Sequence, residues 1–342
     1  MPEPADAAWP NGVSVVMPVL NEERHLSEAV TGILTQDWTG PLEIVLALGP
    51  STDRTDQVAR RLAAVDDRIV QVPNPTGRTP SGLNAAIRAA RYDVVIRVDG
   101  HAVLPPEYVR TAVETLRRTG ADNVGGIMRA EGQTTFEQAV ARAMTTKLGV
   151  GASSFHVGGG EGEAETVYLG SFRKAALDRV GGYDETFLRA QDWEMNHRIR
   201  QTGGVVWFNP EMVVTYRPRP NVKALAKQYF HYGRWRREVM RRHPETSSAT
   251  SALRYFAPPA AVAGVALGTA AGLVATAGGP RVLKLGWLAP AGYLGLITVG
   301  SAVVGRGLPS AALAQLPVVL ATMHGSWGVG FLSSPPDLRE PE

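Results

Sequence analysis

A carboxylate and an imidazole, Asp99 and His101, directly follow the largely β-branched run Val94–Val98. The run predicts a strand that delivers Asp99 to its carboxyl end, and Gly100 permits a turn that brings His101 back to the same place. Ligands of these two kinds suit Mg²⁺ or Mn²⁺ held against a phosphate. Taken alone, the segment is better explained by a polar turn, because Asp-Gly is a common turn pair.

Two further polar clusters follow predicted strands, and they favour a ligand site over a plain polar turn. Asn21 and Glu22 come after the run Val13–Val19, and Ser51–Asp53 comes after Leu42–Leu48. In open parallel sheets, ligands bind beyond the carboxyl ends of the strands. Three polar clusters at one edge are far less expected by chance than one, so we interpret this edge as a site for a cation and a diphosphate.

A second pair of carboxylates, Asp192 and Glu194, flanks Trp193 near the start of a predicted helix over 191–201. A carboxylate is electrostatically favoured at a helix N-terminus, so ordinary capping competes with a catalytic role. The preceding tight turn Gly181–Asp184 indicates that the segment is held in place. A carboxylate held there can remove a proton from an acceptor hydroxyl, with Glu194 orienting it or contacting the acceptor.

The order of predicted elements indicates how these residues are positioned. Strands alternate with helices from Val13 to Val98, which favours an open, mostly parallel, doubly wound α/β sheet. The predicted strands are Val13–Val19, Leu42–Leu48, Arg68–Val72 and Asp93–Val98, and the helices between them are His25–Gln36, Ser51–Val65 and Pro80–Ala90. Further along we expect helices over 105–118, 175–180 and 191–201, strands over 124–130, 166–172, 205–208 and 212–215, and a mobile glycine-rich segment over 149–162.

Composition narrows the class of protein. The 342 residues are 44% hydrophobic and 20% charged, with a formal net charge of +3, which is too small to indicate a nucleic-acid partner. Because cysteine is absent, disulfides, thiolate metal sites and cysteine nucleophiles are excluded. The start of the chain, Met1–Asn11, lacks the basic and apolar regions of a signal peptide, so we expect the polar part to stay in the cytoplasm.

The C-terminal part differs in kind, because charges almost vanish between Tyr255 and Asp337. The uncharged stretches are 255–280, 285–305 and 307–336. A membrane-spanning helix needs about 20 apolar residues, so we expect two to three membrane helices, with a buried helical hairpin in a soluble domain as the alternative. The segment His231–His243, which precedes these stretches, contains five arginines. This composition favours a position at the cytoplasmic membrane surface.

These observations predict three domains and a location. The domains are a catalytic domain over 12–220, a basic amphipathic interfacial segment over 221–250 and a hydrophobic membrane region over 251–336. We expect a multi-pass protein of the cell membrane with its catalytic domain in the cytoplasm.

Several motifs together resemble family 2 glycosyltransferases of the inverting GT-A type. The matching segments are Val15–Glu22, Ser51–Asp53, Val98–His101, Gly181–Asp184 and Gln191–Glu194. Within that family, Asp99–His101 and Thr166–Arg173 are most similar to membrane-associated enzymes of the succinoglycan type. The resemblance covers residues 12–245 and implies a GT-A fold, hexosyltransferase activity and C-terminal membrane helices.

The resemblance also implies roles for individual residues. Asp99 and His101 would coordinate the divalent cation that bridges the diphosphate of a nucleotide-sugar donor, and Asp192 would be the general base. Glu194 and Trp193 would lie on the acceptor side. The expected donor-binding residues are Pro18, Asn21, Glu22, Asp53, Arg78, Asn84 and Asp99, with a plain surface loop an equally good explanation for Arg78.

The sequence departs from the family pattern at two places. The family usually has a carboxylate at the end of the second strand that contacts the uracil, whereas Leu46–Ser51 contains none. A UDP-sugar is still the expected donor, but this residue does not support it. His101 replaces the second acidic member of the metal motif. Imidazole is a more natural ligand for Mn²⁺ than for Mg²⁺, so we predict a preference for Mn²⁺.

The resulting hypothesis is an inverting glycosyltransferase that moves a sugar to a membrane-linked saccharide in exopolysaccharide or cell-envelope glycan synthesis. A hydrophobic acceptor explains why a cytoplasmic catalyst would carry a membrane tail. Two alternatives remain open. One is transfer directly to polyprenyl phosphate or another lipid, and the other is a non-catalytic membrane scaffold with a GT-A fold.

Overall fold

The computed structural model describes residues 9–151, 153–246, 249–336 and 338, which form two compact units that we treat one at a time. The first unit contains the chain up to Arg129 together with Gly158–Tyr216. The second contains Ala130–Val157 and Arg217–Leu338. Residues 130–157, which the sequence-based boundaries place in the catalytic domain, therefore fold with the C-terminal helices.

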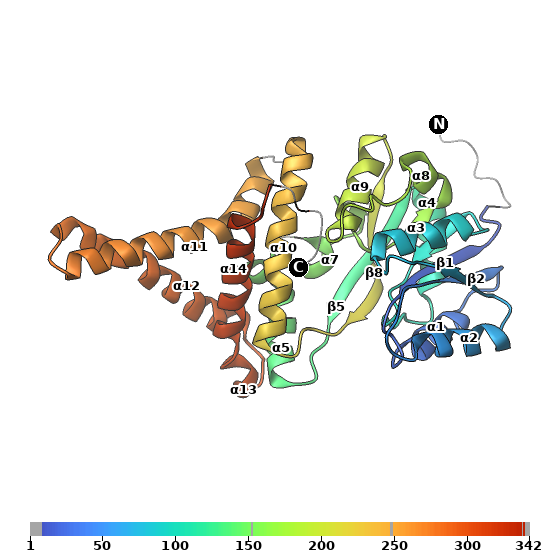
Figure 1. The fold of residues 1–342 in the computed structure, drawn as a ribbon, viewed down its shortest axis with the longest axis horizontal. Helices are drawn as coiled ribbons and strands as arrows, with labels where there is room; N and C mark the ends of the chain where they lie inside the picture. Colours follow the sequence, from blue (N-terminus) through green and yellow to red (C-terminus); the bar gives the residue numbers. More distant parts are fainter. Residues whose placement is uncertain (1–8, 152, 247–248, 337, 339–342) are drawn as a thin grey trace. The chain divides into compact units, whose positions relative to one another are not determined.

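The first unit is built on a mixed sheet with strand order β3-β2-β1-β4-β7-β5-β8-β6 (Figure 1). The strands are β1 (Val13–Val19), β2 (Leu42–Leu48), β3 (Ile69–Pro73), β4 (Val94–Arg97), β5 (Asn123–Ala130), β6 (Gly162–Glu163), β7 (Tyr168–Arg173) and β8 (Val206–Tyr216). Strands β1 to β4 pair in parallel, whereas β7 pairs antiparallel with both β4 and β5. The predicted α/β fold is confirmed, and its parallel half is the part with the alternating strand and helix pattern.

The helices of the first unit agree with the predicted order. They are α1 (Leu26–Leu34), α2 (Thr55–Val65), α3 (Thr79–Ala89), α4 (Tyr108–Thr119), α8 (Lys174–Val180) and α9 (Gln191–Gln201). Figure 1 shows α1 and α2 on one side of β1 and β2, with α3 on the other. The two short strands predicted over 205–208 and 212–215 form one strand, β8.

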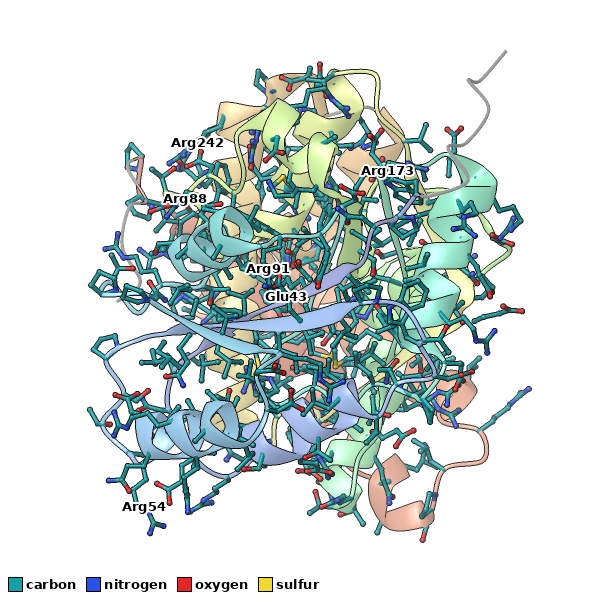
Figure 2. The ribbon with its side chains drawn as sticks, turned by 90° about the vertical axis from the view of Figure 1, so that its right-hand side faces the viewer. Glu43, Arg54, Arg88, Arg91, Arg173 and Arg242 are labelled. Carbon is teal, nitrogen blue, oxygen red and sulfur yellow. The ribbon has the colours of Figure 1, made fainter. Side chains whose placement is uncertain are left out.

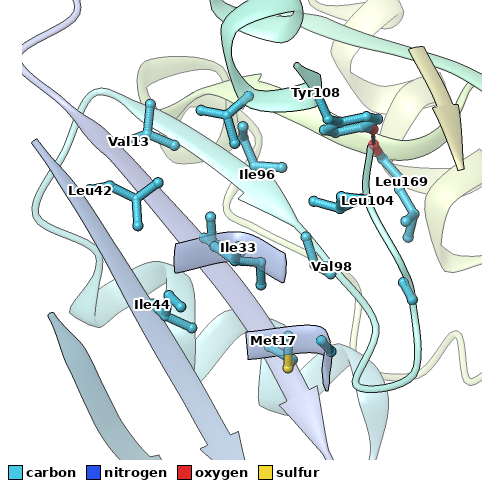
Figure 3. Packing of buried hydrophobic residues seen from close by; sticks show 14 of the residues in the cluster. Val13, Met17, Ile33, Leu42, Ile44, Ile96, Val98, Leu104, Tyr108 and Leu169 are labelled. Carbon is cyan, nitrogen blue, oxygen red and sulfur yellow. Dashed lines mark hydrogen bonds between the residues drawn. The ribbon is translucent and has the colours of Figure 1, made fainter. Parts of the chain in front are cut away.

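Burial on both faces explains why the parallel strands read as nearly continuous apolar runs. Val13 and Met17 of β1, Ile44 of β2 and Ile96 of β4 have no exposed surface. Ile33 of α1 packs over these strands in the core (Figure 3). This layer holds the carboxyl ends of β1, β2 and β4 in fixed register, which is what a site at that edge requires.

One charged residue in this layer, Glu43, has partners that compensate for its burial. Glu43 of β2 is fully buried, accepts a hydrogen bond from Ser14 Oγ at 2.6 Å and pairs with Arg91 Nε at 2.7 Å (Figure 2). Because a buried carboxylate is costly unless it is paired, this cluster stabilises the start of the strands. It lies away from their carboxyl ends and has no part in the site.

The second unit is helical. Its helices are α5 (Thr135–Met144), α6 (Lys147–Val150), α7 (Ser154–Val157), α10 (Val222–Arg242), α11 (Ala249–Thr276), α12 (Leu288–Val304), α13 (Ser310–Leu313) and α14 (Leu316–Leu332), with 3₁₀ segments η1 (Pro244–Thr246) and η2 (Arg281–Trp287). Sequence reasoning missed α5, although Thr134 and Glu137 form a capping box at its start. The glycine-rich segment over 149–162 includes the end of α6, all of α7 and the first residue of β6, and its mobility stays a prediction.

Helix α10 packs closely along α14 through two glycines. A Cβ at Gly233 would lie 2.0 Å from the Trp327 carbonyl oxygen, and one at Gly330 would lie 2.1 Å from that of Phe230. Arg237 of α10 donates to the carbonyl oxygens of Phe331 and Leu332 at 3.0 and 2.8 Å. A cation is favourable at a helix C-terminus, so this arginine of the basic segment stabilises the end of α14.

Two helical segments among the described residues are long and apolar enough to cross a membrane, Tyr255–Thr276 and Arg281–Val304. Most of their surface is exposed, with 17% and 11% of the apolar window buried. The third predicted stretch contains α14, whose residues Leu316, Val319, Leu320 and Met323 are completely buried. The number of membrane helices stays a prediction.

Candidate active site

The loops after β1 and β2 are joined through Asn21. Its backbone lies in the left-handed region, with φ 56°, which Asn tolerates better than most residues. The side-chain oxygen of Asn21 accepts a hydrogen bond from the Thr52 backbone N–H at 2.8 Å, and its own N–H donates to Ser51 Oγ at 3.1 Å. The two predicted polar clusters are thus brought together, and Pro18 lies at the end of the same strand, paired with Ala47.

Asp53 holds this pair of loops together from the other side. Its carboxylate accepts hydrogen bonds from the Thr55 hydroxyl at 2.5 Å and the Thr55 N–H at 3.0 Å, and from the Glu23 N–H at 3.2 Å. The hydrogen bond from the Thr55 hydroxyl lowers the pKa of Asp53 below its ordinary value. In this arrangement both oxygens of Asp53 serve the loops, and a role in donor binding stays a prediction.

His101 is oriented by Glu22. Nδ1 of His101 lies 2.7 Å from Glu22 Oε1. Gly100 leaves room for the Glu22 side chain, because a Cβ there would lie 2.9 Å from Glu22 Cγ. Metal-binding histidines usually donate their second ring N–H to a carboxylate, which fixes the tautomer so that the other nitrogen carries the lone pair. Asp99 and the oriented His101 therefore offer oxygen and nitrogen atoms of the kind that bind a divalent cation.

Arg97, which sequence reasoning did not single out, links the two ends of the site. It is the last residue of β4, is only 5% exposed, and donates from Nε and Nη2 to Asp99 Oδ1 at 3.2 and 3.0 Å. Its Nη1 donates to Asp192 Oδ1, 95 residues further along the chain. Alternate residues of an extended strand share a side, which explains why Arg97 and Asp99 meet. The signal in the sequence that could have indicated its role is a positively charged residue inside an otherwise apolar strand.

This arrangement sets the electrostatics of Asp192. Desolvation raises the pKa of Asp192, Arg97 opposes that rise, and the Asp99 carboxylate adds to it. Its side chain remains 35% exposed, and Tyr183 donates a hydrogen bond to the same oxygen, Oδ1, at 3.4 Å. Burial lowers the pKa of Arg97, but Asp192 and Asp99 together raise it well above its ordinary value, so the guanidinium stays charged. A carboxylate of raised pKa facing solvent is a suitable general base.

Asn84 holds the turn that leads to Asp192. Its side-chain oxygen accepts from the Tyr183 N–H at 2.8 Å, and its amide donates to the Tyr183 carbonyl at 2.8 Å and to Glu185 Oε1 at 2.9 Å. Gly182 has φ +76°, and a Cβ there would lie 2.6 Å from Asn84 Oδ1, so only glycine fits. Asn84 is thus engaged with the turn, and its expected contact with the donor stays a prediction.

The structure places the residues expected on the acceptor side inside the unit. Glu194 is 2% exposed and forms a two-pronged ion pair with Arg198, at 2.6 and 2.7 Å. Trp193 is 7% exposed and stacks on His197 with 5.2 Å between ring centroids. Both residues support α9, which in turn carries Asp192.

Arg78 lies at the start of α3. It is exposed at the N-cap position of α3, where its N–H donates to Thr76 Oγ1 at 3.2 Å and its carbonyl accepts from Asn74 at 3.1 Å. The backbone of Arg78 therefore starts the helix. The contact expected between the Arg78 side chain and the donor stays a prediction.

The chain is similar to known glycosyltransferases. A sequence model of the family described as Glycosyl transferase family 2 matches residues 14–181. The succinoglycan biosynthesis protein ExoA of Rhizobium meliloti (strain 1021) is 34% identical over 334 residues, covering 95% of each chain. A dolichyl N-acetyl-alpha-D-glucosaminyl phosphate 3-beta-D-2,3-diacetamido-2,3-dideoxy-beta-D-glucuronosyltransferase of Methanococcus voltae is 26% identical over 231 residues, covering 65% of this chain and 72% of the relative.

Among solved structures, the mannosyltransferase PcManGT of Pyrobaculum calidifontis, in complex with GDP-Man and Mn²⁺, has a TM-score of 0.60 and 21% identity. The similarity covers 95% of this chain and 87% of that one, and supports the GT-A fold. The identity to ExoA extends over nearly the whole of both chains. The chain therefore belongs to glycosyltransferase family 2 and is a glycosyltransferase.

Proposed function

We propose that this glycosyltransferase transfers a hexose from a nucleotide-sugar donor to a membrane-linked saccharide, with inversion at the anomeric carbon. The observation that carries the proposal is the contact of one guanidinium, that of Arg97, with both Asp99 and Asp192. It puts a carboxylate suited to the donor side next to one suited to proton removal. The similarity to a succinoglycan biosynthesis protein supports a place in exopolysaccharide or cell-envelope glycan synthesis.

The proposed mechanism assigns one task to each end of the site. Asp99 and His101 would hold a divalent cation, which supplies Lewis-acid neutralisation of the departing nucleoside diphosphate. Asp192 accepts the proton of the acceptor hydroxyl. The acceptor oxygen forms a bond to the anomeric carbon on the face opposite the leaving phosphate, whose bond to that carbon breaks. The acceptor is thereby glycosylated and the nucleoside diphosphate is released.

The donor and the cation are proposed in general terms. The loop after β2 offers no carboxylate before Asp53, whose oxygens bind Thr55 and Glu23, so backbone groups would recognise the base. A UDP-sugar remains the expected donor from the family resemblance, with GDP-sugars as the second class to test. Mn²⁺ is favoured over Mg²⁺ because His101 offers nitrogen, and the structural neighbour PcManGT was solved with Mn²⁺.

A membrane location is proposed from the second unit. Leu267 of α11 and Leu288 and Leu294 of α12 are 72%, 68% and 66% exposed, and burial in lipid would remove this apolar surface from water. A multi-pass anchor through α11 and α12 would keep the catalytic unit at the cytoplasmic surface. The Methanococcus voltae relative, named for a dolichyl-linked phosphate, supports a lipid-linked acceptor.

The test uses the full-length protein purified in detergent, with nucleotide sugars and Mn²⁺. We expect slow release of nucleoside diphosphate from one donor, abolished by Asp192→Asn and by Asp99→Ala. Asp178→Asn is the matched control, because Asp178 pairs only with Lys174 on the surface of α8 in the described chain and is 59% exposed. Thermal stabilisation by each nucleotide with Mn²⁺ identifies the base independently of turnover.

Two outcomes favour the alternatives. Release of nucleoside diphosphate that depends on added polyprenyl phosphate, with the sugar recovered on that lipid, indicates direct transfer to the lipid. No turnover with any donor, in a protein that nucleotides do not stabilise, favours a non-catalytic scaffold.

A further inference from the structure

We infer that Arg97 is a positioning residue that fixes one oxygen of each active-site carboxylate and leaves the other oxygen for chemistry. This inference rests on the proposed function, because it assumes that Asp99 serves the cation and Asp192 the acceptor. It goes beyond that proposal by assigning a task to a residue that holds both carboxylates.

The bonding pattern is the first support. Both bonds from Arg97 to Asp99, from Nε and Nη2, end on Oδ1. Within the described part of the chain, the contacts of the Asp192 carboxylate, from Arg97 and Tyr183, also end on Oδ1. Oδ2 of Asp99 is then the oxygen for the cation, and Oδ2 of Asp192 the oxygen for the acceptor proton.

Exposure gives the second support. Arg97 is 6% exposed as a side chain, whereas Asp99 and Asp192 are 25% and 35% exposed. The guanidinium of Arg97 is therefore buried behind the two carboxylates, and the carboxylates face solvent. Substrates would approach from the exposed side, where they can meet the carboxylates without displacing the guanidinium.

The chemistry of the guanidinium gives the third support for the inference. Its five N–H groups lie in one rigid plane, so a single arginine can bind two carboxylates in fixed directions, whereas a lysine ammonium is a point charge on a flexible stem. Holding reacting groups in place contributes strongly to catalysis, and a 1 Å displacement costs about 100-fold in rate. Arg97→Lys keeps the charge and loses the geometry, which makes it the informative substitution.

The experiment compares Arg97→Lys with the wild type and with Arg110→Lys in the full-length protein. Arg110 is an exposed arginine of α4 that pairs with Asp37 at 3.0 Å, outside the site. We expect kcat of Arg97→Lys to fall about 100-fold, with the KM for the donor changed less than about threefold. We expect Arg110→Lys to keep wild-type values. Guanidinium ion added to Arg97→Ala should restore part of kcat.

A wild-type kcat in Arg97→Lys overturns the inference. So does a loss of activity that is fully explained by a smaller folded fraction, measured by thermal melting. If Arg97→Lys does not fold, Arg97→Gln provides the test, because its planar amide can contact one carboxylate but cannot hold both as the guanidinium does. A lower kcat at unchanged KM supports the inference, and an unchanged kcat contradicts it.

The two proposals fail in different ways. Full activity in Asp192→Asn contradicts the base and hence the proposed function. An inactive Asp192→Asn beside a fully active Arg97→Lys contradicts only the inference about Arg97.

Discussion

Glu22 Oε1 and His101 Nδ1 lie 2.7 Å apart, although the residues are separated by 79 positions in the chain. Glu22 follows β1 and His101 follows β4, and these two strands are neighbours in the sheet. Their contact links the loop next to Asn21 with the proposed cation site. The imidazole therefore has a fixed orientation before any ligand arrives.

We predict that Glu22→Gln weakens cation binding about 10-fold to 100-fold, the usual cost of losing the outer partner of a metal-binding histidine. The measurement is the Mn²⁺ concentration that gives half-maximal donor turnover. Glu28→Gln, at an exposed position on α1, is the control and should leave that concentration unchanged. Equal Mn²⁺ requirements in both variants would contradict the role of Glu22.

His101→Asp is predicted to shift the metal preference. A second carboxylate replaces the imidazole nitrogen with oxygen, the ligand that Mg²⁺ prefers. Activity with Mg²⁺ relative to Mn²⁺ should therefore rise, measured side by side with the wild type at saturating metal. A ratio that stays the same would show that His101 does not select the cation.

Asn84→Ala is predicted to lower both stability and kcat. It leaves the N–H and carbonyl of Tyr183 without their side-chain partner, at about 1 to 3 kcal/mol for each buried group left unpaired. Thermal melting should show the loss, and the KM for the donor should change little if Asn84 only holds the turn. Asn11→Ala, which removes an exposed bond to the Asp93 N–H, should cost less. A large rise in KM at unchanged melting temperature would instead support the donor contact expected from the sequence.

The pH dependence follows from Asp192. Its pKa is raised from the ordinary 3.8, chiefly by desolvation, and only the ionised form can accept a proton. Activity should therefore be present above that raised pKa and be lost as the pH falls through it, at a higher pH than an ordinary aspartate would give. A profile of kcat against pH tests this. A rate that stays constant down to about pH 4, the usual range of a carboxyl group, contradicts the assignment.

The absence of cysteine makes the membrane prediction easy to test. Ala277→Cys lies just after α11, in the connection to η2, and Arg60→Cys lies at an exposed position of α2 in the catalytic unit. In intact cells, a membrane-impermeant maleimide should label the first and not the second, whereas lysed cells should show labelling of both. Protection of both cysteines in intact cells would exclude a hairpin that crosses the membrane.

The sequence alone predicted the elements whose physical cause is local. The apolar runs of β1, β2 and β4 must be buried, so their positions and their parallel direction could be inferred, and with them the edge that carries Asn21, Asp99 and His101. Helix α9 was predicted with its observed ends. In contrast, α5 was missed because its apolar face packs within the second unit, and its capping box alone is a weak signal.

Tertiary structure decided which side chains share a partner. Glu194 and Asp192 look equivalent in sequence, two positions apart in one helical turn, but a helix turns neighbouring positions to different faces. Glu194 is therefore buried against Arg198, and Asp192 meets Arg97. Arg97 itself appeared only as a charge in a strand. Its contact with a residue 95 positions away depends on how β4 and α9 pack, which no local pattern in the chain records.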